Sequence, residues 1–222
     1  KDVLDPQGKV INQALDGIIF RPIAKIYRVL PSPVRSGVNN SLDNLSNLVT
    51  IPNNILQGEF KQAGVNTGRL LLNSTVGILG IVDVAEQIGF PEYEKEDFGQ
   101  SFAKHGMGPG CYLVLPVLGP STARDTISST LNFVGGDAWY NLTVRNDTQY
   151  FSDIDYYTSK VTEGVNFRAK NFDDIESLKE NSLDFYASVK SLYLQDRQQK
   201  ILNTKKIIET QNDSDWEEID SQ

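Results

Sequence analysis

Four residues with catalytic side chains lie in one short segment. His105, Ser121 and Asp125 are the residue types of a Ser–His–Asp triad, and Cys111 stands between them. His105 is the chain's one histidine, so it would have to be the base. The serine sits in "GPSTA" (119–123), which departs from GxSxG at its fifth position and has no expected strand–turn–helix context. The pattern favours loop residues over a triad.

Other chemistry is equally poorly supported. Cys111 has apolar neighbours, which do not activate a thiol, and one cysteine permits neither a disulfide within the chain nor a CxxC metal site. The acidic clusters at 92–97, 173–176 and 217–220 lack the spacing of a calcium loop. The glycines at 106, 108 and 110 lack the spacing of a phosphate loop. We therefore expect no catalytic constellation, no metal and no cofactor.

The segment that holds these residues has an unusual composition. Residues 106–123 carry no charge, and residues 111–118 are almost wholly apolar. Three prolines and four glycines interrupt the segment, which excludes an ordinary helix, and Pro116 is unsuited to a central strand. The segment is too apolar for a surface loop and too broken for a helix.

Length and charge narrow the class of protein. The 222 residues suffice for one large domain, and a net charge of −8 argues against a nucleic-acid binder. Residues 1–70 carry a net charge of +3 and residues 91–222 a net charge of −9, which indicates two differently used surfaces. The charge-free run of residues 70–82 has only 13 residues, fewer than the ~20 of a membrane-spanning helix.

Helix signals dominate the chain, and the clearest helix spans residues 22–30. Pro22 suits a first turn, and the prolines at 31 and 33 would end the helix. Arg21, Lys25 and Arg28 share one face, and Ile19, Ile23, Ile26, Tyr27 and Leu30 occupy much of the rest. Such a helix either lies flat in a membrane interface or packs on a core as an ordinary surface helix. The pattern alone favours the second.

Further helices are expected at 41–49, stopped by Pro52, and from residue 53 or 54 to 60. Others are expected near 125–139, at 152–178 with Ser152 as cap, and after a Ser182 cap to about residue 200. Glycines at 77, 80 and 89 predict turns, and residues 92–97 a charged loop. The polar tail from about residue 203 is expected to be disordered or to order on a partner.

Several blocks, in order, resemble one known family. They are "LDGIIFRPIAKIYRVLPSPVRSGVNN" (15–40), "LQGEFKQAG" (56–64), "GRLLLNSTVGILGIVDVA" (68–85), "EDFGQSF" (96–102), "GMGPG" (106–110), "YLVLPVLGPSTARD" (112–125) and the helical region 168–197. Together they resemble the MlaA/VacJ lipoproteins of the Gram-negative outer membrane over most of residues 15–200. Two features depart from the family: Cys111 replaces a usual proline, and the lipid-bearing N-terminal cysteine is not in this chain.

The resemblance implies an all-α, ring- or disc-like domain (1–202) of short amphipathic, interfacial helices around a central amphipathic pore, followed by an acidic tail (203–222). It implies a non-enzymatic protein of the periplasmic side of the outer membrane, lipid-anchored in its full-length form. Phospholipid misplaced in the outer leaflet would pass through the pore to a soluble periplasmic carrier. The implied partners are the phospholipid bilayer, a trimeric porin and that carrier. Two alternatives are a porin-associated scaffold that transports nothing and a Ser121/His105/Asp125 phospholipase.

The resemblance also suggests roles for particular residues. Tyr112, Leu113, Val114 and Leu115 would form part of the apolar pore wall. Gly106 and Gly108 would be hinges of a hairpin at the pore, or would only make tight turns. Arg21, Lys25 and Arg28 would face lipid phosphates.

Overall fold

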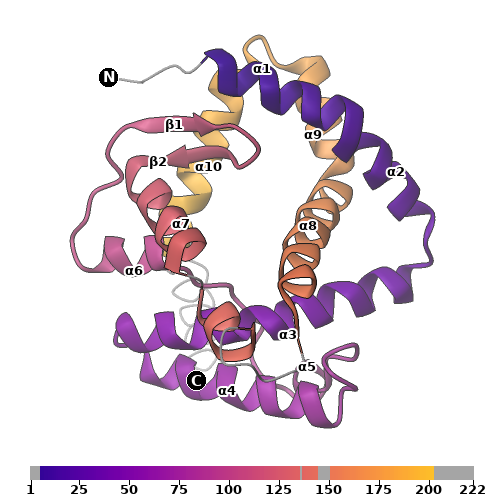
Figure 1. The fold of residues 1–222 in the computed structure, drawn as a ribbon, viewed down its shortest axis with the longest axis vertical. Helices are drawn as coiled ribbons and strands as arrows, with labels where there is room; N and C mark the ends of the chain where they lie inside the picture. Colours follow the sequence, from indigo (N-terminus) through magenta and orange to yellow (C-terminus); the bar gives the residue numbers. More distant parts are fainter. Residues whose placement is uncertain (1–5, 136, 145–150, 203–222) are drawn as a thin grey trace, which may run out of the picture.

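A computed structural model describes residues 6–135, 137–144 and 151–202. Seen down the shortest axis, its elements are arranged in a ring (Figure 1). They are, in chain order, α1 (Pro6–Leu15), η1 (Asp16–Phe20), α2 (Arg21–Val29), α3 (Ser32–Leu56), α4 (Phe60–Thr75), α5 (Val84–Gln87), α6 (Phe98–Lys104), β1 (Tyr112–Leu115), β2 (Gly119–Thr122), α7 (Ala123–Gly135), η2 (Tyr140–Val144), α8 (Asp153–Lys170), α9 (Phe172–Asn181) and α10 (Phe185–Leu202). The prediction of an all-α, ring-like protein is confirmed.

Local signals set several helix boundaries. Pro22 lies in the first turn of α2, and the helix ends at Leu30, whose backbone is extended. Ser152 caps α8 through a reciprocal capping box with Asp155. Both boundaries agree with the sequence prediction. In the described part of the chain, no helix combines the length and the apolar character needed to cross a bilayer.

Three predicted boundaries are wrong. α3 runs unbroken through Pro52, because side-chain bonds hold the helix beyond it: Asn53 donates to the Val49 carbonyl at 2.8 Å and accepts from the Ser101 hydroxyl at 2.7 Å. The helix predicted for 152–178 is divided at Asn171 into α8 and α9. Ser182 ends α9, and Asp184 rather than Ser182 accepts from the first turn of α10, at the Ala187 N–H.

A β-hairpin occupies the apolar segment where the sequence analysis expected no strand. β1 and β2 are antiparallel, with Tyr112 opposite Thr122 and Leu115 opposite Gly119. Pro116 lies in the turn between them, and Pro120 lies in β2, whose other edge pairs with no strand among the described residues. In those positions a missing N–H removes little pairing, so the prolines are compatible with this two-stranded sheet.

The interior of the structure is polar. The largest fully buried side chains are Gln100, Asn47, Asn53, Asn54, Asn66, Thr50 and Thr122. Amide hydrogen bonds join α3 to α4, from Asn44 to the Ser74 hydroxyl at 2.9 Å and from Asn66 to Asn54 at 2.8 Å. Buried hydrophobic residues are mostly small, whereas large ones are exposed on many elements. This distribution is the reverse of that in an ordinary water-soluble domain.

Candidate functional site

Large apolar side chains are exposed on many elements, and we call two groups of them, on α2 and in the turn after α4, the apolar rim. On α2, Ile26 and Val29 are 71% and 83% exposed. In the turn after α4, Ile78 and Leu79 are 65% and 76% exposed. This turn packs against the first part of α3, where Ile81 contacts Gly37. The rim offers a surface that water disfavours and lipid does not.

The α2 helix presents its apolar face outward and its basic face to the protein. Arg28 makes a two-pronged ion pair with Asp173 of α9, at 2.7 and 2.9 Å. Arg21 pairs with Glu176 at 2.6 Å, and the Lys25 ammonium lies 5.9 Å from the Phe172 ring centre. The predicted helix is present, and its three cations all meet α9. Their role as headgroup contacts stays a prediction.

The turn after α4 keeps its apolar side chains outward at a conformational cost. Ile78 and Leu79 both have positive φ, 54° and 56°, which is unfavourable for residues with a Cβ and worst for a β-branched one. The turn is closed around Gly77, where a Cβ would lie 2.2 Å from the Val82 carbonyl oxygen. A hydrogen bond from the Gly80 N–H to the Asn73 carbonyl, 2.8 Å, holds the turn to α4.

The hairpin lies between α1 and α10. Tyr112 is buried, and its ring packs edge-on against Tyr186 at 5.8 Å and Tyr193 at 6.0 Å, both on α10. At the tip, the Asn12 side chain donates to the Leu115 carbonyl and accepts from the Val117 N–H, at 2.8 and 2.6 Å. Tyr112 therefore anchors β1 to α10. Leu113, Val114 and Leu115 are half-buried, and the pore-wall role of all four stays a prediction.

The two glycines expected to act as hinges differ in conformation. Gly106 has φ +91°, follows the end of α6 and has no other atom near its missing side chain. Gly108 also has open space around it, but its φ lies outside the left-handed region. Of these two positions, only 106 has a backbone conformation that requires glycine. Whether either glycine moves stays a prediction.

The possible catalytic residues are not brought together. His105 Nδ1 lies 2.8 Å from the Ser101 carbonyl oxygen, and the Ser121 hydroxyl meets Thr126 at 3.1 Å. No hydrogen bond within the described ranges joins Ser121 to His105. Asp125 instead serves the ion-pair network described next, and no group of three or more potential metal ligands occurs in the described part.

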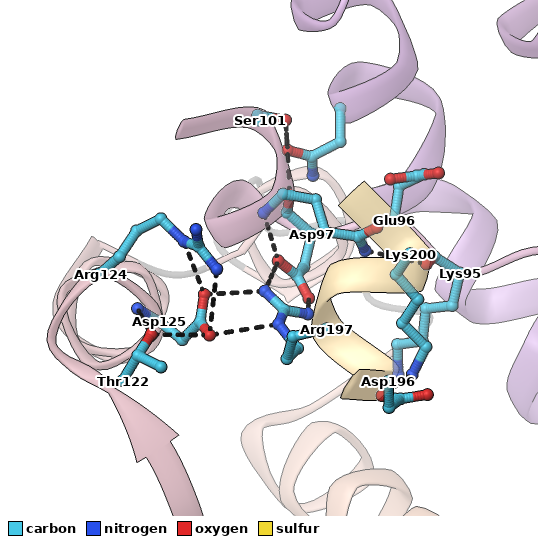
Figure 2. A network of polar contacts seen from close by, with 12 residues as sticks. Lys95, Glu96, Asp97, Ser101, Thr122, Arg124, Asp125, Asp196, Arg197 and Lys200 are labelled. Atoms are coloured by element: carbon cyan, nitrogen blue, oxygen red, sulfur yellow. Dashed lines mark hydrogen bonds and ion pairs between the residues drawn. The ribbon is translucent and has the colours of Figure 1, made fainter. Parts of the chain in front are cut away.

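A partly buried ion-pair network fastens α10 to α7 and to the start of α6 (Figure 2). The Arg197 guanidinium donates to Asp97, before α6, at 2.7 and 3.1 Å, and to Asp125, on α7, at 2.8 and 3.1 Å. Asp125 also accepts from Tyr193 at 2.7 Å and from Arg124 at 3.0 Å. The sequence analysis missed this network, since Arg197 lies 72 and 100 residues from its partners.

A second network closes the ring at η1. The Arg168 guanidinium of α8 donates to Asp16 at 2.7 Å and to Glu176 at 2.6 Å. The Lys179 ammonium of α9 reaches the same Asp16 carboxylate at 2.5 Å. Residues near the start of the chain are thereby tied to its last third.

The Arg197 network makes the stability of the fold sensitive to acid. Burial raises the pKa of Asp125, but the donors from Arg197, Tyr193 and Arg124 outweigh it and lower this pKa to about 2. The pKa of Asp97 is lowered in the same way by Arg197. A lowered pKa gives stability that is present above the unfolded value of ~3.9 and is lost as pH falls through the folded value.

We therefore expect the free energy of unfolding to decline as pH falls from about 5 to 2. Urea unfolding in mild detergent at several pH values would measure it. Arg197→Met should show a shallower decline, because its two carboxylates have lost their main partner. Equal slopes for the two proteins would contradict this origin of the acid sensitivity.

Comparisons with known proteins agree with this geometry. A family model described as MlaA lipoprotein matches residues 8–200. The "Intermembrane phospholipid transport system lipoprotein MlaA" of Shigella flexneri is 32% identical over 186 residues, which cover 82% of this chain and 69% of that protein. An uncharacterized protein of Rickettsia prowazekii is 31% identical over 202 residues, covering 86% of this chain and 75% of that protein.

A solved structure described as "Structural basis for maintenance of bacterial outer membrane lipid asymmetry" is also similar. It matches with a TM-score of 0.73 and 26% sequence identity, covering 90% of this chain and 99% of that one.

Proposed function

Because the chain belongs to the MlaA lipoprotein family, we propose that it is a phospholipid transport protein of the outer membrane. In this proposal it removes misplaced phospholipid from the outer leaflet through a central pore and passes it to a soluble periplasmic carrier, and so maintains lipid asymmetry. It catalyses no covalent step. A trimeric porin holds it in the membrane, and the full-length protein carries a lipid anchor.

One observation supports the proposal most strongly: the fold is polar inside and apolar outside, and no described helix is fit to span a bilayer. Such a protein suits a position within one leaflet, where acyl chains cover its exposed side chains. The apolar rim would face these chains. Arg21, Lys25 and Arg28 would contact lipid phosphates from the neighbouring face of α2, because Arg21 and Arg28 retain 45% and 35% of their side-chain exposure.

In this proposal the ring encloses the transport path. We propose that lipid passes within it beside the hairpin, with Leu113, Val114 and Leu115 on the apolar side of the path and Tyr112 holding β1 in place. Residues 1–202 form the transporting domain in this proposal. The proposed acidic tail, 203–222, lies outside the described residues.

A transfer assay tests the proposal against its two alternatives. The full chain would be placed in vesicles containing a fluorescent phospholipid, with a soluble lipid-carrier protein as acceptor. Transport predicts intact fluorescent lipid on the carrier. A scaffold predicts none, and a phospholipase predicts labelled lysolipid or fatty acid that disappears in Ser121→Ala. Either of the last two results would overturn the proposal.

The two glycines allow the hinge to be tested separately from folding. Gly108→Ala should leave the free energy of unfolding within about 0.5 kcal/mol, since its Cβ meets no other atom and its φ is not left-handed. Gly106→Ala should cost about 1 kcal/mol because of its φ of +91°. Lipid transfer that falls in Gly108→Ala at unchanged stability would support a moving hinge. Unchanged transfer in both variants would leave the glycines as turn formers only.

A further inference from the structure

An ammonium group lies against two aromatic rings and a carboxylate where η2 meets α8. The Lys160 Nζ lies 5.7 Å from the Trp139 ring centre and 5.2 Å from the Tyr156 ring centre. It also pairs with the Asp137 carboxylate at 3.1 Å. Two π faces and one negative charge around a cation are the arrangement by which proteins recognise ammonium groups. We call Asp137, Trp139 and Tyr156 the ammonium cage.

The cage is built more firmly than its occupant. Asp137 and Trp139 are each 3% exposed, and the rings of Trp139 and Tyr156 lie 4.8 Å apart. Asp137 is fixed by the Tyr156 hydroxyl at 3.0 Å and by the Tyr140 N–H at 2.9 Å. The Lys160 side chain is 37% exposed and has a flexible four-carbon stem. If Lys160 moved away, Asp137 would keep its bonds to Tyr156 and Tyr140.

A small amphipathic pocket adjoins the cage. Leu42, Leu45 and Val49 of α3 line one side, and Trp139, Lys160 and Glu163 line the other. The Glu163 carboxylate is already paired with the Lys95 ammonium. These apolar side chains lie beside the Lys160 cation, but the pocket is only about the size of one water molecule, so it places the headgroup ammonium and not an acyl chain.

We propose that the ammonium cage binds the headgroup of an ethanolamine phospholipid in exchange with Lys160. The lipid ammonium enters the cage and pairs with Asp137, and the released Lys160 ammonium pairs with the lipid phosphate. Two ion pairs replace the one in the protein, and the buried carboxylate never loses its cation. A glycerol headgroup brings no cation and cannot make this exchange. The inference rests on the proposed function, since it names the lipid class that this pathway would favour.

Binding of short-chain lipids to the full chain tests the cage. The chain has two tryptophans, so Trp216→Phe leaves Trp139 as the sole fluorescent reporter. Dihexanoyl phosphatidylethanolamine and dihexanoyl phosphatidylglycerol would be titrated below their micellar concentrations. We expect about 10-fold tighter binding of the ethanolamine lipid, and Asp137→Asn should abolish that preference. Asp196→Asn, which changes an exposed carboxylate on α10, should retain it.

A second variant guards against misfolding of Asp137→Asn. Lys160→Met removes the competing ammonium, so protonated ethanolamine alone should bind at least several-fold tighter than to the parent, which a misfolded protein would not do. Equal binding of the two lipids, or a preference that survives Asp137→Asn, would overturn the cage while leaving lipid transport intact. Binding of neither lipid would count against the proposed function itself, and the cage would fall with it.

Discussion

Replacing Arg197 with methionine is expected to lower the free energy of unfolding by about 3 kcal/mol. The side chain is nearly isosteric along its stem but carries no charge, so Asp97 and Asp125 lose their shared partner. Asp125 is the more costly of the two, because its side chain is only 9% exposed. It retains donors from Thr122, Arg124 and Tyr193, which keeps the expected loss at the lower end for a broken buried ion pair.

A matched control lies one turn away on the same helix. Lys200 pairs with Asp196 at 2.7 Å, but these side chains are 50% and 54% exposed (Figure 2). Lys200→Met removes the same charge from α10 and should change stability by no more than about 0.5 kcal/mol. Denaturant unfolding in mild detergent, followed by far-UV circular dichroism, would compare the two variants. Coincident midpoints would contradict a structural role for the Arg197 network.

The ring is held together by ion pairs because its large apolar side chains are mostly on the outside. A water-soluble ring could close by burying large hydrophobic residues between its ends. Here many of these residues point outward. In lipid there would be no hydrophobic driving force to bury them against one another. Arg197 and Arg168 instead join helices that are distant in sequence. Each guanidinium donates to two carboxylates on different elements, which fixes both elements relative to its own helix. Polar contacts thereby set the relative positions of the helices in the ring.

What the sequence predicted well depends on local chemistry. Pro22 and Ser152 mark helix starts because the signal and the effect lie within one turn. The outcome at Pro52 could not be predicted in this way, since its neighbours Thr50 and Asn53 are held by Tyr93 and Ser101, some 43 to 48 residues away. Proline does disfavour the interior of a helix, but tertiary contacts outweigh that preference at Pro52.

The same limit applies to the candidate site. The spacing of Arg21, Lys25 and Arg28 predicted one basic face, which the structure confirms. It could not show what that face meets, because Asp173 lies 145 residues from Arg28. An amphipathic pattern divides a helix into two faces, but it does not tell which of the two packs against the rest of the protein.

Aspartates in place of both Ile26 and Val29 are expected to lower binding to phospholipid vesicles by more than about 100-fold. Each side chain would contribute about 1.5 kcal/mol or more when acyl chains cover it, and an inserted carboxylate adds a desolvation cost. Stability without vesicles should change little, because these side chains are 71% and 83% exposed. Cosedimentation with vesicles and denaturant unfolding would measure the two quantities on the same variant.

The control adds the same two charges elsewhere. Gln198→Asp with Gln199→Asp places them on exposed positions of α10 and should leave vesicle binding nearly unchanged. Lys25→Gln gives the opposing comparison, since a cation near an anionic surface contributes only about 1 kcal/mol, roughly a five-fold effect that salt suppresses. If Lys25→Gln were the more damaging change, the basic face of α2 would be the one that meets the membrane. The larger, salt-insensitive loss expected from the aspartates would place the apolar face there, because only burial of hydrocarbon persists at high ionic strength.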